Sequence, residues 1–169
     1  LGSKSTAMGW FALGSQNFTT ATDSHNVAVG FSAGSAVTTA TLSTLIGSLA
    51  GDAITTGSYN TAVGYSAAGA MNTGLENTIM GALAGAAFTD ADYNVAMGVQ
   101  ALAADTKGSK SVAIGAQALF DQNFTTSTDA LNVAVGYQAG TNVTTGSLNT
   151  LIGGLAGLSV TGGGNTIVG

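Results

Sequence analysis

The chain has 169 residues, of which 45% are hydrophobic and only 7% are charged, and it contains no cysteine and no proline. This balance excludes a disordered chain, and the lack of cysteine excludes a disulfide scaffold and thiolate metal ligands. The net charge is −5, and the only basic residues besides the one histidine are Lys4, Lys107 and Lys110. Because phosphate backbones are bound through Lys and Arg, we expect no nucleic-acid partner.

Apolar residues never form the run of about 20 that a membrane-spanning helix needs, because Gly, Ser, Thr and Asn recur every few positions. No signal-peptide pattern is visible either. We therefore expect no membrane insertion. Both ends of the sequence lie inside a repeat, so we expect residues 1–169 to be a single repetitive segment of a longer chain.

A pentapeptide that ends in glycine recurs along the chain, as in NVAVG (26–30), NTAVG (60–64) and SVAIG (111–115). Successive glycines are separated by 21, 17, 17, 17, 17, 17, 21, 17 and 16 residues. A short fixed period is typical of a solenoid, in which each coil stacks on its neighbours. The predicted coils end near Gly9, Gly30, Gly47, Gly64, Gly81, Gly98, Gly115, Gly136, Gly153 and Gly169.

A longer period is superimposed on the coils. Residues 3–51 align without a gap with residues 109–157, at an offset of 106 residues, and 32 of the 49 positions are identical. Both copies carry the same four-residue lengthening, at 15–24 and 121–130. One superrepeat therefore consists of six coils.

Each coil is expected to contain two short strands. The first is the pentapeptide, and the second is an apolar–Thr–Thr step such as Val37-Thr38-Thr39 or Ile54-Thr55-Thr56. Gly, Ser, Asp and Asn fill the turns between them, and the recurring glycines disfavour helix. The sequence predicts an all-β protein, a parallel β-solenoid or β-roll with about 17 residues per coil, associated as a trimer.

Both faces of the pentapeptide strand carry apolar side chains, which alternate in direction along a strand. We expect the fourth position (Val29, Ile46, Val63, Met80, Met97, Ile114, Val135, Ile152) to face the coil's own core. The third position would then face outward. A strand that is apolar on both faces is buried on both, which predicts a subunit interface at the third position. Its members are Ala28, Leu45, Ala62, Ile79, Ala96, Ala113, Ala134 and Leu151.

Side-chain size also alternates between coils. Ala62 accompanies the aromatic Tyr65, whereas Leu45 accompanies the small Ser48. Close packing of a shared interface requires such compensation. The alternative is that both positions share the monomer's interior and conserve volume there.

The pentapeptides NVAVG, SVAIG and NTAVG resemble the head repeats of trimeric autotransporter adhesins, and the Y-x-A-G and T-T-G-S segments resemble repeats in phage tail fibres. The resemblance extends over essentially the whole chain. It implies a left-handed β-roll that associates in threes. It further implies an extracellular, cell-surface or virion-surface location and attachment to a cell-surface glycan or protein receptor.

One column of polar residues occupies the first pentapeptide position, and stacked amides of this kind can hydrogen-bond from coil to coil as a ladder. Its members are Asn26, Asn60, Asn77, Asn94, Asn132, Asn149 and Asn165. Three N-x-[ST] sequences make Asn17, Asn123 and Asn142 candidate glycosylation sites. The Thr–Thr steps predict a file of hydroxyls like that of ice-binding solenoids, but the file is interrupted at Thr89-Asp90 and Asp105-Thr106.

Catalytic and metal-binding residues are not predicted. His25 is the only histidine, so no triad or histidine-rich metal site can form, and we expect neither an enzyme nor a cofactor. Weak calcium binding at an Asp-containing corner remains an alternative. The lengthened corners are the candidates for contact with a partner, although their Phe18 and Phe124 are expected in the core. The leading hypothesis is a structural shaft or head of a trimeric surface fibre, and the competing one is a self-assembling extracellular filament.

Overall fold

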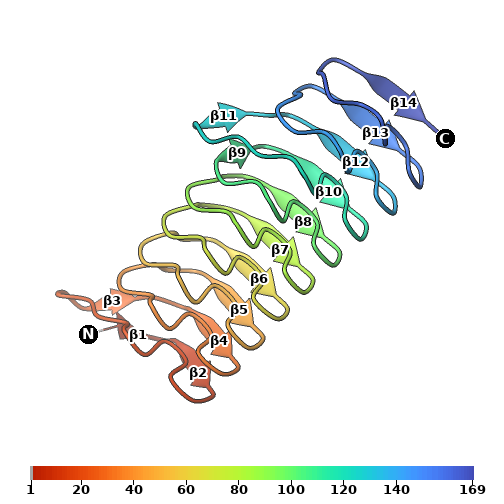
Figure 1. Cartoon of the computed structure of the whole chain (residues 1–169). Coiled ribbons are helices and arrows are strands. Elements are labelled where there is room, and N and C mark those ends of the chain that lie inside the picture. Colours follow the sequence, from red (N-terminus) through yellow and green to blue (C-terminus); the bar gives the residue numbers. More distant parts are fainter. Residues whose placement is uncertain (1) are drawn as a thin grey trace.

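Ten of the pentapeptides form the strands of a single parallel sheet in the computed structural model, which describes residues 2–169 (Figure 1). Consecutive strands pair in register, so that Ala62 lies opposite Ile79 on the next coil. The prediction of an all-β parallel solenoid with roughly 17 residues per turn is confirmed. The strands are β2 (Thr6–Met8), β4 (Val27–Val29), β5 (Thr44–Ile46), β6 (Thr61–Val63), β7 (Thr78–Met80), β8 (Val95–Met97), β10 (Val112–Ile114), β12 (Val133–Val135), β13 (Thr150–Ile152) and β14 (Thr166–Val168).

Glycine ends each pentapeptide because no other residue fits there. Gly64 has a φ of 137°, which L-residues rarely adopt. A Cβ atom on Gly64 would also lie 2.6 Å from the carbonyl oxygen of Gly81 on the next coil. The backbones of adjacent coils therefore approach most closely at this turn, and the turn sets the repeat.

The second strand that we expected at the apolar–Thr–Thr step is absent from the coils, and this part of the prediction is wrong. Thr38 and Thr39 form a bend. The backbone N–H groups of Thr38, Thr39 and Ala40 all point to the carbonyl oxygen of Thr55, at 2.9, 3.2 and 3.3 Å. Convergence of three donors on one acceptor curls the chain, whereas a ladder needs one acceptor for each extended residue pair.

The four short remaining strands belong to the two lengthened coils. β1 (Gly2–Ser3) pairs with β3 (Thr22–Asp23), and β9 (Gly108–Ser109) pairs with β11 (Thr128–Asp129), both in parallel. The extra residues therefore extend the coil wall on the side opposite the long sheet (Figure 1).

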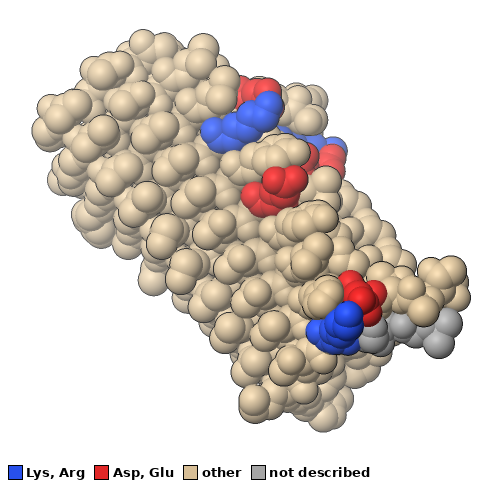
Figure 2. All heavy atoms as spheres, turned by 180° about the vertical axis from the view of Figure 1, so that it is seen from behind, with Lys and Arg blue, Asp and Glu red and all other residues tan. Residues whose placement is uncertain are grey.

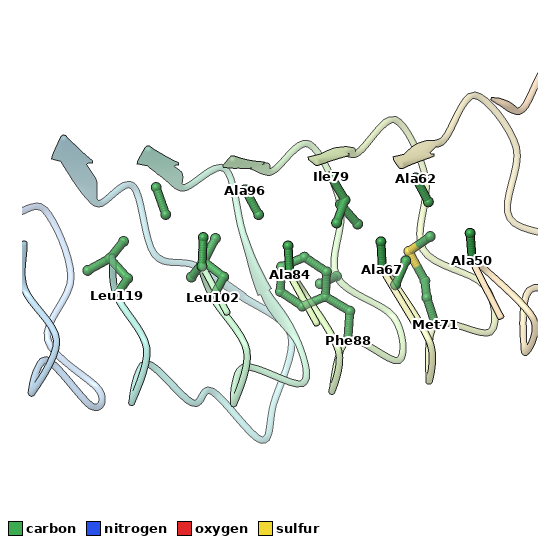
Figure 3. Close-up of a cluster of buried hydrophobic side chains, with 14 of the residues drawn as sticks. Ala50, Ala62, Ala67, Met71, Ile79, Ala84, Phe88, Ala96, Leu102 and Leu119 are labelled. Atoms are coloured by element: carbon green, nitrogen blue, oxygen red, sulfur yellow. The ribbon is translucent and has the colours of Figure 1, made fainter. Parts of the chain in front are cut away.

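The direction of the pentapeptide side chains is the reverse of the prediction. Ala62 and Ile79 are fully buried, whereas Met80 is 39% exposed. Figure 3 shows Ala62, Ile79 and Ala96 pointing from their strands toward the opposite wall. The interior is narrow, so it admits the smaller third-position side chain. The residues assigned to a subunit interface (Ala28, Leu45, Ala62, Ile79, Ala96, Ala113, Ala134 and Leu151) form the core instead.

Volume is conserved in this core, as the alternative interpretation required, but between positions 3 and 9 of the coil. Position 3 is Leu45 where position 9 is Gly51, and a Cβ on that glycine would lie 2.8 Å from Cδ2 of Leu45. Conversely, Ala96 at position 3 accompanies Leu102 at position 9, and both are buried. Tyr65, at position 6, is 54% exposed and does not share this interior.

Two neighbouring substitutions test the corrected assignment. We expect Ile79→Ala to lower the free energy of unfolding by about 2–5 kcal/mol, because it leaves a cavity in the core. Met80→Ala, on the outer side of the same strand, should lower it by about 1 kcal/mol or less when the chain is kept monomeric by dilution. Urea denaturation followed by circular dichroism measures both. Equal losses, or a larger loss for Met80→Ala, would contradict the assignment.

Candidate interaction surface

The outer side of the long sheet presents two regular columns of side chains. Coil positions are counted here from the first residue of each pentapeptide. Position 2 is Thr or Val in every coil, and position 4 is Val, Ile or Met. In residues 2–169 all fourth-position side chains are exposed or half-buried, among them Ile46, Met80 and Ile152. Because the strands pair in register, these side chains form a flat and continuous apolar surface.

Two more columns continue this surface around the turn that follows each strand. Position 6 carries exposed aromatic residues in several coils, namely Trp10, Phe31, Tyr65 and Tyr137. The rings of Trp10 and Phe31 stack with centroids 5.1 Å apart. Position 7 is occupied mainly by Leu, Ser and Gln. We call the columns at positions 2, 4, 6 and 7 together the outer face.

Charged residues avoid the outer face. All three lysines and all eight acidic residues lie at other coil positions. Figure 2, which views the molecule from behind, shows them gathered toward one side of an otherwise uncharged surface. Lys4 with Asp23 and Lys110 with Asp129 form exposed ion pairs, both at 2.6 Å. The hydrogen bond from Lys110 to Asp129 raises the pKa of that lysine, and burial raises the pKa of the Asp52 carboxyl.

The asparagine column lies inside the coil and joins the two walls as well as successive coils. Asn77 Oδ1 accepts a hydrogen bond from the backbone N–H of Asn94 at 2.9 Å. Its Nδ2 donates to the carbonyl oxygen of Ala91, on the opposite wall, at 2.8 Å. Asn60, Asn132 and Asn149 make equivalent contacts. These buried amides satisfy backbone groups that the strands leave unpaired.

A buried polar cluster interrupts the core where the asparagine column is broken by Ser111. The Asp105 carboxylate is fully buried and accepts hydrogen bonds from Gln122 Nε2 at 2.5 Å and from the backbone N–H groups of Gly108 and Phe124 at 2.9 and 3.0 Å. Gln122 Oε1 in turn accepts from Asn132 Nδ2 at 2.7 Å. Every described buried side-chain polar atom has a partner.

Sequence reasoning missed this cluster, although a signal was present. Asp105 and Gln122 stand at coil position 12, which is apolar in other coils. The residues there include Val37, Ile54, Met71, Phe88 and Val143, all of them fully buried. A polar residue at such a position indicates a buried hydrogen-bond network.

The candidate glycosylation sites differ in accessibility. Asn17 and Asn142 are exposed, whereas Asn123 is half-buried and its Oδ1 accepts a hydrogen bond from Thr106 Oγ1 at 3.2 Å. Asn142 Nδ2 donates to the carbonyl oxygen of Leu158 at 2.7 Å. The Thr–Thr file lies on a bend rather than on a flat strand, so it presents no planar array of hydroxyls.

The remaining candidates lie apart from one another. His25 is exposed at a corner with a φ of 50°. Phe18 and Phe124 of the lengthened corners are buried, as expected. In residues 2–169 no three His, Asp or Glu side chains gather as metal ligands, and no pocket is present. The same residues include no helix that could cross a membrane.

Comparison with known proteins adds no relative. No protein-family model, no curated protein and no solved structure matches the chain. The resemblance to adhesin heads and tail fibres therefore stays a prediction from the pentapeptides.

Proposed function

We propose that the chain is a structural shaft or head segment of a trimeric fibre on a cell or virion surface, and that the fibre serves attachment to a host or another surface. The observation that carries this proposal is the outer face, which is flat, apolar and free of charge over its whole length. Large exposed apolar surfaces of this kind mark sites of protein association. Depletion of charge is characteristic of interface cores.

The rest of the molecule is consistent with a load-bearing role. Backbone hydrogen bonds join every coil to the next, and the buried asparagines cross-link the walls. At about 4.8 Å per strand, the ten coils extend over roughly 45 Å. A receptor, either a glycan or a protein, would bind the exposed surfaces that remain outside the seam between copies.

Negative-stain electron microscopy of the purified protein tests the proposal. We expect short rods of uniform length with three lobes in end view, and retention of the protein on cells or on an array of cell-surface glycans. Rods that lengthen with protein concentration would favour the self-assembling filament instead. Single thin rods with no association would overturn the proposal.

A further inference from the structure

Side-chain bulk is exchanged between positions 6 and 7 of the outer face. Where position 6 is aromatic, position 7 is small in two coils; where position 6 is small, position 7 is leucine in three. The pairs are Phe31 with Ser32, Ser48 with Leu49, Tyr65 with Ser66, Ala82 with Leu83, and Gly154 with Leu155. Where position 7 is glutamine, the side chains of Gln100, Gln117 and Gln138 hydrogen-bond in a ladder from coil to coil.

Nothing within the chain requires this exchange. Phe31 and Tyr65 are 52% and 54% exposed, so their bulk does not fill the interior, where positions 3 and 9 already compensate one another. Exposed side chains of different size on neighbouring residues do not compete for the same volume. The exchange is explained if another surface packs against both columns.

A second copy of this chain provides such a surface when the rods lie parallel. Rotation about an axis parallel to the rods places each coil beside the same coil of the neighbouring copy. If position 6 of one copy then packs on position 7 of the next, each level receives one large and one small side chain. A shift by one coil would set Tyr65 against Leu49 or Leu83, and Ala82 against Ser66. Overpacked levels would alternate with voids, which close-packed interfaces do not tolerate.

We propose that copies of this chain associate in parallel and without axial shift, with the sixth-position column of one copy packed on the seventh-position column of the next. The inference rests on the proposed function and adds the register of the copies and the residues that meet. The outer face is about 45 Å long and about 17 Å wide from position 2 to position 7. Its area of about 750 Å² is close to the roughly 800 Å² that each partner contributes to a standard specific interface.

Disulfide trapping tests the register, because the chain contains no native cysteine. Differently tagged Tyr65→Cys and Ser66→Cys chains are co-expressed, oxidised mildly and separated by size under denaturing conditions. We expect the mixed dimer of the two tagged chains, because their Cα atoms would lie within the 4.4–6.8 Å that a disulfide spans. A second pair on the next coil, Ala82→Cys with Leu83→Cys, should behave alike.

Tyr65→Cys with Gln100→Cys is the matched control. These positions differ by two coils, an axial distance of about 9.6 Å, so no mixed dimer is expected. A cross-linked control, or three-chain particles in which neither same-coil pair cross-links, would overturn the register and leave the fibre proposal standing. A single-chain mass in the same preparations would overturn both.

Discussion

Replacing Asp105 with alanine is expected to lower the free energy of unfolding by about 3–6 kcal/mol. The substitution removes the acceptor for three buried donors, the N–H groups of Gly108 and Phe124 and the amide of Gln122. Each buried donor that is left without a partner costs about 1–3 kcal/mol. Urea denaturation followed by circular dichroism measures the loss.

Two further variants make this prediction specific. Asp90→Ala removes an exposed carboxylate, which accepts a hydrogen bond from Thr73 Oγ1 at 2.9 Å, and should change stability by no more than about 0.5 kcal/mol. Asp105→Asn should fall between the two, because its oxygen still accepts from the backbone while its NH₂ group opposes that of Gln122. The account of the cluster would be wrong if Asp105→Ala were no more harmful than Asp90→Ala.

Replacing Met80 with glutamate is expected to dissociate the assembly while leaving the fold intact. The side chain lies near the middle of the outer face, and its substitution would place one unpaired carboxylate per copy in a buried seam. An uncompensated buried charge costs about 3–5 kcal/mol, which corresponds to a loss of two to four orders of magnitude in association constant. Sedimentation velocity measures the dissociation, and circular dichroism measures the fold.

The matched control for this variant is Thr56→Glu, which adds the same charge to an exposed position of the bend. We expect its sedimentation to equal that of the unchanged protein. If both variants remain assembled, the outer face is not the seam. If both dissociate, net charge rather than the outer face governs association.

The period of the fold could be predicted from the sequence because glycine recurs where only glycine fits. The positive φ of Gly64 and its approach to Gly81 leave no room for a side chain, so the spacing of such residues reports the length of a coil. The second strand could not be predicted, because Val37-Thr38-Thr39 has the composition of a strand. The bend there is determined by the shared acceptor on Thr55, which the sequence does not reveal.

The orientation of the strands was predicted in the wrong sense for a physical reason. Alternation establishes that positions 3 and 4 point in opposite directions, but not which of them points inward. Met80 is bulkier than most third-position residues, which favoured it for the core. The walls of this coil lie so close that alanine suffices at many third positions, as at Ala62 and Ala96 (Figure 3). Correcting the orientation moves the candidate seam from the third position to the outer face.

The most direct test of association through the outer face is the mass of the unmodified protein in solution, measured by native mass spectrometry. The account predicts one discrete species with three times the chain mass of 16.3 kDa. A species of one chain mass at all accessible concentrations would contradict it, because the outer face would then be stable in water without a partner copy.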